Sequence, residues 1–185
     1  AMRDWAHFEE ITQELFATEL ASSLKDIYWD VRPKPEFGTV EIRVFDTPLS
    51  VKKAVALAAF ARACAALALN GHLPVADEPT PPTAERVSRF LACRDGMEAV
   101  LFNPFVGEWM PARKWFEQIL DAAQQEPIYA VDSEHLEFLR GLMGGEQDYE
   151  IMRKMWANVQ ASDPNPEDLT WSLAKYSSEL CKMLT

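Results

Sequence analysis

The chain has 185 residues, of which 48% are hydrophobic, and this is enough to bury the core of one domain or a little more. Its formal net charge of −11 disfavours nucleic acid and anionic membranes as partners, because both carry negative charge of their own. Nucleotides are not excluded, since a local arginine cluster and Mg²⁺ can outweigh the charge of the whole chain. The three cysteines form no C-x-x-C pair, which predicts reduced thiols in the cytoplasm and neither a zinc site nor a disulfide framework. The longest apolar run, residues 54–69, contains Arg62 and is too short for a membrane span.

Most of the chain is predicted to be helical, because its apolar side chains recur at the three- and four-residue spacing of helix faces. Ser50 and Asp132 are predicted N-caps of two helices, and Asn165, followed by a proline, is a third. The longest helix carries a stripe of small side chains that would let it approach a neighbour closely, formed by Ala54, Ala58, Ala61 and Ala65. The predicted helices cover residues 7–22, 51–70, 81–94, 112–125, 133–142, 148–160 and 167–184, with a proline-rich loop at 72–82 and a short strand at 99–103.

The stretch DIYWDVRPKPEFGTVEIRVFD, residues 26–46, has the β-branched and aromatic composition of a strand pair. We expect strands at residues 27–32 and 39–46. Two prolines and a glycine lie between them, at residues 33–38, and predict the turn. Because side chains alternate along a strand, one face of the pair is predicted to be apolar and suited to packing under helices, and the other face is predicted to be charged.

The charged face carries the candidate site. Asp30 and Arg32 share this face on the first strand, and Glu41 and Arg43 share it on the second. One register of the hairpin sets Asp30 opposite Glu41, flanked by the two arginines. In one interpretation the four charges only stabilise the sheet, by roughly 0.2–1 kcal/mol for each cross-strand pair. In the other they form a phosphate and metal site, because carboxylates hold Mg²⁺ and arginine forks bind phosphate oxygens.

The sequence DIYWDVRPKPEFGTVEIRVFDTPLSVKKAVALAAFARA, residues 26–63, resembles the core motif of the family 2 glutamate–cysteine ligases. This group includes the bacterial ATP-dependent carboxylate–amine ligases. Its pattern D-[IV]-R-P-x-P-x-[FY]-G-T-[VIL]-E-[IFV]-R-V, followed by D-T-P and an alanine-rich helix, is long and specific. The resemblance continues more weakly in RFLACRDGMEAVL, residues 89–101, where members usually carry R-x-x-A-x-R-x-G-[LM]. Here Asp95 follows Arg94, where members commonly have an aromatic residue.

The resemblance implies an α+β fold that is mostly helical, whose strand pair belongs to a glutamine synthetase-like antiparallel catalytic sheet. Residues 1–185 would form a single domain, the carboxy-terminal half of such a catalytic domain. The other half would lie upstream of the motif in a longer protein. We therefore expect this chain to pair with that amino-terminal half or to form a homo-oligomer, and to have little or no activity alone.

The resemblance also implies an amide-forming reaction that runs through an acyl phosphate. ATP would phosphorylate the carboxylate of a glutamate-like amino acid, and an amine acceptor would then displace the phosphate. Glu41 would be a ligand of Mg²⁺, Arg43 would contact the transferred phosphate, and Arg32 would bind phosphate or a substrate carboxylate. Asp30 would orient one of the arginines in the ATP site. The alternative is a non-catalytic helical binding or oligomerisation domain that kept the strand pair.

Overall fold

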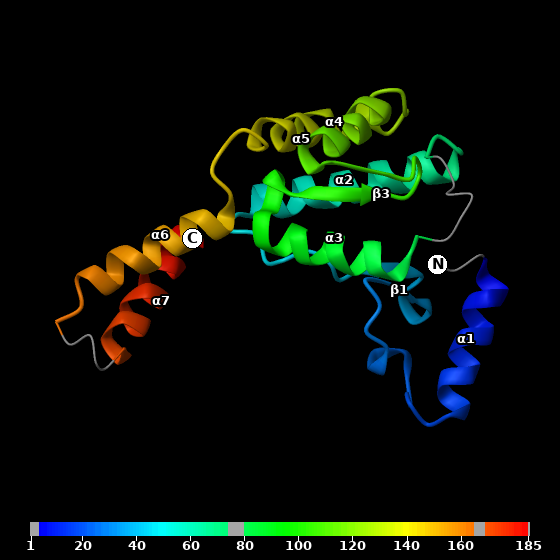
Figure 1. Ribbon diagram of the computed structural model, residues 1–185, viewed down its shortest axis with the longest axis horizontal. Helices are drawn as coiled ribbons and strands as arrows, with labels where there is room; N and C mark the ends of the chain where they lie inside the picture. Colours follow the sequence, from blue (N-terminus) through cyan, green and yellow to red (C-terminus); the bar gives the residue numbers. More distant parts are fainter. Residues whose placement is uncertain (1–3, 74–79, 165–168, 185) are drawn as a thin grey trace. The chain divides into compact units, whose positions relative to one another are not determined.

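Seven helices and two antiparallel strand pairs make up the part of the chain that the computed structural model describes, residues 4–73, 80–164 and 169–184 (Figure 1). This composition confirms the predicted α+β class. The chain divides into two units, Ala1–Thr47 and Pro48–Thr185, and the expectation of a single domain stays a prediction. None of the described helices is long and apolar enough to cross a membrane. The predicted N-cap at Asn165 and most of the loop predicted at 72–82 lie outside the described residues.

The first unit begins with α1 (Trp5–Ala17), whose N-cap is Asp4. The carboxylate of Asp4 accepts a hydrogen bond from the backbone N–H of His7 (2.8 Å), which satisfies one of the unpaired donors of the first turn. The buried Phe8 packs edge-on against Trp29, with ring centroids 5.8 Å apart. The helix ends five residues before the predicted position, because Glu19 adopts a left-handed conformation (φ 56°) that stops it.

The strand pair of this unit is shorter than predicted and begins later. β1 (Val31–Lys34) and β2 (Thr39–Ile42) run antiparallel. A single 3₁₀ turn, Pro35–Phe37, joins them, and Gly38 closes the turn in the left-handed region at φ 62°. The predicted position of the turn is therefore right, but its first two residues belong to β1.

Pro33 lies within β1, although the sequence predicted it in the turn. The backbone N–H of Arg43 donates to the carbonyl oxygen of Asp30 (2.7 Å). In an antiparallel pair only alternate residues point their N–H groups at the partner strand, so this bond places residues 30, 32 and 34 in the bonded positions. Position 33 needs no donor toward β2, and a proline is tolerated there.

The core of the second unit lies between α2 (Val51–Leu69), α4 (Ala112–Ala123) and α5 (Tyr129–Leu142). Ser50 caps α2 as predicted, since its hydroxyl accepts from the N–H of Lys53 (3.1 Å). The buried face of α2 is not the predicted alanine stripe: Ala54, Ala58 and Ala65 are exposed and Ala61 is half-buried. The core is formed by buried residues that include Ala59, Ala63, Leu67, Leu120, Leu136 and Met143.

Asp132 is not the N-cap that the sequence predicted, because α5 begins one turn earlier, at Tyr129. The side chain of Asp132 is buried and forms an ion pair with Nη2 of Arg62 on α2 (3.2 Å). The carboxylate therefore links two helices. The preceding residues Glu126 and Pro127 start the helical turn that the prediction missed, with the N–H of Tyr129 donating to the carbonyl oxygen of Glu126 (2.9 Å).

The helix α3 (Pro82–Asp95) begins at a proline, as predicted, and leads to a second strand pair, β3 (Val100–Asn103) and β4 (Glu108–Pro111). The predicted strand at 99–103 is confirmed, whereas β4 was not predicted. Its four residues end in a proline directly before α4, and they are too few to show a strand pattern. The three cysteines are free in the structure.

The last two helices are α6 (Asp148–Ala161) and α7 (Thr170–Leu184), close to the predicted ranges. Asp148 attaches the start of α6 to the start of α2. Its Oδ2 accepts from the N–H of Leu49 (2.9 Å), and its Oδ1 lies 3.0 Å from Nζ of Lys53. Leu49 directly precedes the N-cap Ser50, and a carboxylate near the first turn of a helix is favoured by the helix dipole, so this contact stabilises the N-terminal end of α2.

The buried carboxylate of Glu126 makes the stability of the second unit depend on pH. The side chain of Glu126 is 1% exposed, accepts from Nδ2 of Asn70 (2.6 Å) and contacts Nδ1 of His72. These partners, His72 first, lower the pKa of Glu126 below its usual value of 4.5, against the opposing effect of burial. A lowered pKa stabilises the folded state above pH 4.5, and this stabilisation is lost as the pH falls through the lowered pKa.

We therefore expect Glu126→Gln to be less stable than the wild type at pH 7, and the difference to shrink steadily below pH 4.5. Urea unfolding followed by circular dichroism between pH 7 and acid measures this difference. A difference that stays constant over the whole range would show that the charge of Glu126 contributes nothing.

Candidate functional site

The observed register of β1 and β2 sets Arg32 opposite Glu41. The predicted register set Asp30 opposite Glu41, and it is wrong by two residues. A shift by two keeps every side chain on its predicted face, so the charged face survives. The physical reason is electrostatic: the predicted register would have placed two carboxylates directly opposite each other, whereas the observed one places an arginine opposite a glutamate.

Arg32 lies at the centre of this arrangement, with a side chain only 5% exposed. Its Nη1 donates to the carbonyl oxygens of Leu24 (2.7 Å) and Ile27 (3.4 Å). Its Nε and Nη2 donate to the same carboxylate oxygen, Oε2 of Glu41, at 2.9 and 2.5 Å. The guanidinium thus uses most of its N–H donors in hydrogen bonds within the first unit. It ties the segment before β1 to β2 and holds the carboxylate of Glu41 in place.

Glu41 is the more exposed partner, with 37% of its side chain accessible. Among the described residues, the hydrogen bonds and ion pairs of its carboxylate all end on Oε2, including a contact with Nζ of Lys34 at 3.8 Å. Hydrogen bonding by Arg32 lowers the pKa of Glu41; burial opposes this, and the charges of Arg32, Lys34 and Arg43 lower it further. The carboxylate is therefore ionised at neutral pH, and Oε1 is the oxygen through which it can meet a ligand.

Arg43 follows the end of β2 and is exposed. Its guanidinium carbon lies 4.7 Å from the centre of the Tyr28 ring, a cation–π contact that holds the side chain over the strand pair. The backbone of Arg43 is paired with that of Asp30, as described above. Asp30 itself is half-buried, and the role predicted for its carboxylate stays a prediction.

The charges at the strand pair fit an anion accompanied by a metal better than a bare metal. Arg32, Lys34 and Arg43 are cationic and Glu41 is anionic, which gives a formal charge of +2, or +1 when Asp30 is counted. Such a cluster repels free Mg²⁺ and attracts phosphate. Among the described residues, no group of three or more metal-ligating side chains occurs. Glu41 is the residue here that would hold a Mg²⁺ ion, provided that an anionic ligand came with the metal and offset the surrounding positive charge.

Reasoning from the sequence did not assign two residues, Lys34 and Tyr28, to the candidate site. Lys34 was assigned to the turn, although the alternation of β1 places it two residues beyond Arg32 and on the same face. Alternation along the predicted strand also places Tyr28 on the face of Asp30 and Arg32, but its contact with Arg43 depends on how the chain bends before β1. The period-two pattern could therefore have found Lys34 and the face of Tyr28, but not the contact between Tyr28 and Arg43.

A comparison of the chain with known protein families identifies the family to which the motif of residues 26–63 belongs. The model of glutamate–cysteine ligase family 2 matches residues 1–169. The chain belongs to this family. The match confirms the resemblance that the motif of residues 26–63 indicated, and it extends that resemblance through α6.

Named relatives agree with the family. The chain is 39% identical over 155 residues to a protein of Paracidovorax citrulli (strain AAC00-1). The aligned region covers 80% of this chain and 40% of that protein. The chain is 52% identical over 105 residues to a protein of Bordetella avium (strain 197N), covering 55% and 24%. Both carry the name "Putative glutamate--cysteine ligase 2". The chain spans about 40% of the length of the first of these ligase-family relatives.

The weaker ligase-family segment, residues 89–101, lies in the second unit on α3 and β3. Arg94 forms a two-pronged hydrogen bond with its neighbour Asp95, from Nε to Oδ1 (2.7 Å) and from Nη2 to Oδ2 (2.8 Å). Asp95, which departs from the family pattern, is therefore the residue that binds the guanidinium of Arg94. Arg94 also lies 5.3 Å from the centre of the Phe90 ring. These contacts give Arg94 a local role on the surface of α3.

Proposed function

We propose that the complete protein is an ATP-dependent carboxylate–amine ligase of the glutamate–cysteine ligase type. The observation that carries the proposal is the pair formed by Arg32 and Glu41, which occupies the family motif and presents one ionised carboxylate oxygen inside a cluster of cations. The match to the family and the ligase names of the relatives support it. The substrates would be ATP, a glutamate-like amino acid and an amine acceptor.

The reaction class requires charge to be stabilised on a phosphoryl group in transfer. A carboxylate oxygen is a poor leaving group, and phosphorylation by ATP converts it into a good one before the amine attacks. Cations placed where negative charge develops lower that barrier without having to reorganise. At this site Arg43 and Lys34 would bind phosphate oxygens, and Glu41 would hold the Mg²⁺ that neutralises the phosphates.

The contacts of Arg32 support a positioning role beside the ligand-binding role that the family motif implies. Because it is buried and hydrogen-bonded to Leu24, Ile27 and Glu41, we assign it the positioning of Glu41. Direct binding of phosphate by Arg32 stays a prediction. A carboxylate held from behind by an arginine presents its free oxygen in one direction, which suits a metal ligand.

The strand pair would be covered in the complete protein. Val31, Val40, Ile42 and Val44 are exposed, although the sequence predicted an apolar layer packed under helices. Strand edges and apolar strand faces of this kind recruit further chain. Since the relatives are longer than this chain, we propose that an amino-terminal portion of the complete protein covers this face and supplies the remaining ligands of Mg²⁺.

The test of this proposal is amino-acid-dependent phosphate release by the complete protein. We expect Glu41→Gln to lower turnover by about 10–100-fold, because the amide removes the negative charge that holds Mg²⁺. The matched control is Glu36→Gln, the same chemical change at an exposed position in the turn of the same strand pair. It should keep turnover within about twofold of the wild type.

Equal rates for wild type and Glu41→Gln would make Glu41 an ordinary strand residue. The non-catalytic binding domain would then replace the ligase as the better account of the strand pair. Circular dichroism of both variants shows whether a lost rate reflects a lost fold. The isolated chain is expected to release little phosphate in the same assay, since one carboxylate holds Mg²⁺ only weakly.

A further inference from the structure

The two arginines of the strand pair use their N–H donors differently. Arg32 donates to the carboxylate of Glu41 and to two backbone carbonyl oxygens. Among the described residues, the side chain of Arg43 forms no hydrogen bond or ion pair, and its contact is with the ring of Tyr28. A cation–π contact attracts the charge of a guanidinium without supplying an oxygen acceptor. The N–H donors of Arg43 therefore stay available for the oxygens of an incoming anion.

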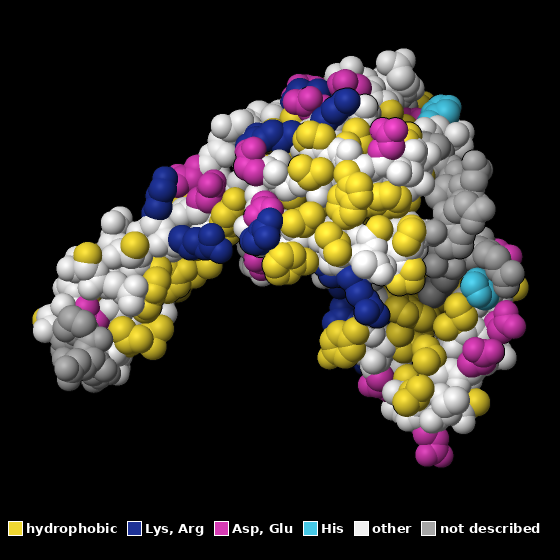
Figure 2. All heavy atoms as spheres, viewed as in Figure 1, with side chains coloured by type: hydrophobic (Ala, Val, Ile, Leu, Met, Phe, Trp, Pro, Cys, Tyr) yellow, Lys and Arg dark blue, Asp and Glu magenta, His cyan; other side chains and the backbone are white. Residues whose placement is uncertain are grey.

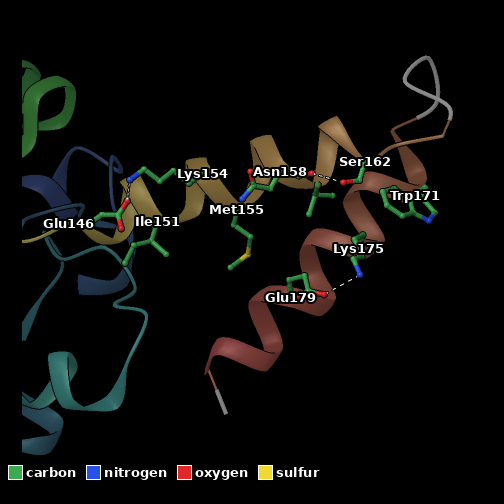
Figure 3. Close-up of a pocket in the computed structure, with 10 residues that line it drawn as sticks. Glu146, Ile151, Lys154, Met155, Asn158, Ser162, Trp171, Lys175 and Glu179 are labelled. Carbon is green, nitrogen blue, oxygen red and sulfur yellow. Dashed lines mark hydrogen bonds and ion pairs between the residues drawn. The ribbon is translucent and has the colours of Figure 1, made fainter.

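Several cations elsewhere in the chain are already neutralised by carboxylates, and many Lys and Arg side chains lie beside Asp and Glu side chains on the face shown in Figure 2. In the groove lined by α6 and α7, Nζ of Lys154 lies 2.5 Å from Oε1 of Glu146 (Figure 3). Nζ of Lys175 lies 3.2 Å from Oε1 of Glu179 in the same groove. A paired cation binds an anion weakly, because its own carboxylate repels the anion. Arg43 has no such partner among the described residues, which favours it as an anion-binding cation.

Tyr28 does not contribute to the core of the first unit. It is 83% exposed, whereas the buried apolar residues of this unit include Phe8, Ala21 and Ile27. Because hydrophobic stabilisation follows the apolar area removed from water, so exposed a ring adds little to the stability of the fold. The ring does provide a surface for the guanidinium of Arg43, whose Cζ lies 4.7 Å from its centre. The contact therefore orders the side chain of Arg43 more than it stabilises the unit.

The backbone fixes the two ends of this contact relative to each other. Tyr28 precedes β1 and Arg43 follows β2, and the N–H of Arg43 donates to the carbonyl oxygen of Asp30 (2.7 Å). With its backbone held by Asp30 and its charge held by Tyr28, the long side chain of Arg43 keeps fewer of its rotamers. An arginine that becomes ordered only when an anion binds loses side-chain entropy at that moment, and an arginine that is ordered beforehand avoids this loss.

We propose that Tyr28 is a positioning residue of the phosphate site, and that its ring orders the guanidinium of Arg43 before a phosphoryl group arrives. The anion is a polyphosphate, because a guanidinium with available donors matches phosphate oxygens and because the strand pair carries a net positive charge. The consequence of this inference for turnover rests on the proposed function, whereas its consequence for anion binding does not.

The first test is amino-acid-dependent phosphate release by the complete protein. Tyr28→Leu keeps an apolar side chain but removes the ring, and it should lower kcat/KM about 5- to 10-fold, the size of one cation–π contact. Tyr28→Phe keeps the ring and should stay within about twofold of the wild type. Phe90→Leu is the matched control: an arginine also lies over this exposed ring (5.3 Å), but Arg94 uses its donors on Asp95. This control should also stay within about twofold.

A double-mutant cycle separates positioning from packing. In the Arg43→Met background, Tyr28→Leu should change kcat/KM by less than about twofold, because its effect passes through the guanidinium. A ring that only packs against other parts of the complete protein would cost as much in this background as in the wild type. Circular dichroism shows that each variant keeps its fold.

The second test measures anion binding without turnover. Calorimetric titration of the complete protein with inorganic tripolyphosphate should give a dissociation constant about 5- to 10-fold higher for Tyr28→Leu than for the wild type. Tyr28→Phe and Phe90→Leu should stay within about twofold. A complete protein without turnover would refute the ligase function, and this titration would then decide the role of Tyr28 by itself.

Three results would overturn the positioning role of Tyr28. The first is a wild type that does not bind tripolyphosphate, or a Tyr28→Leu variant that binds it as tightly as the wild type. The second is a Tyr28→Phe variant that loses as much as Tyr28→Leu, because the hydroxyl and not the ring would then matter. The third is a full loss from Tyr28→Leu in the Arg43→Met background.

Discussion

Replacing Arg32 by methionine is expected to destabilise the strand pair by about 2–4 kcal/mol. Methionine keeps most of the apolar stem but leaves the carbonyl oxygens of Leu24 and Ile27 and the carboxylate of Glu41 without their donor. Breaking a buried ion pair costs about 3–5 kcal/mol. The expected value is lower here, because Glu41 is partly exposed and water can hydrate it after the change.

The measurement is amide hydrogen exchange of residues 27–46, read by mass spectrometry. A loss of about 2–4 kcal/mol speeds exchange by about 30- to 1,000-fold at these positions. Arg43→Met is the matched control from the same strand pair: Arg43 is exposed over Tyr28, so its loss should change the exchange rate by no more than about fivefold. Equal effects of the two substitutions would contradict the central place that we give to Arg32.

In the helical unit, Leu67→Ala is expected to lower the free energy of unfolding by about 2–5 kcal/mol. Leu67 is fully buried among α2, α4 and α5, in contact with the core that contains Leu120 and Leu136. Truncation removes the transfer free energy of the side chain and leaves a cavity that the alanine-rich face of α2 cannot fill. Urea unfolding followed at 222 nm measures the loss, with an unchanged dependence on urea concentration.

Leu69→Ala is the control for this prediction. It makes the same substitution two residues further along α2, at a side chain that is almost entirely exposed. The change in helix propensity is similar at both positions, so the comparison isolates the effect of burial. We expect less than about 0.5 kcal/mol for Leu69→Ala. A similar loss for both would mean that the core does not lie on the face of α2 that Leu67 occupies.

The features that could be predicted from the sequence depend on interactions between residues that are close in the chain. The stretch of residues 26–63 indicated the family because it resembles the motif of that family over its whole length. Ser50 predicted the start of α2, since an N-cap hydroxyl acts within three residues of itself. The positions of the glycine-closed turn and of most helices followed for the same reason: the interactions that define them join residues close in the chain.

What the tertiary structure decided involves partners that are distant in the chain. Alanines occur on every side of α2, so their spacing could not show that residues 59 and 63 face the core in place of the predicted stripe. Asp132 was predicted to be an N-cap, but it forms an ion pair with Arg62, which lies 70 positions earlier in the chain. Arg32 matched a phosphate ligand in the motif. Its burial, and its hydrogen bonds to Leu24 and Ile27, depend on how the chain folds back before β1, which no residue pattern encodes.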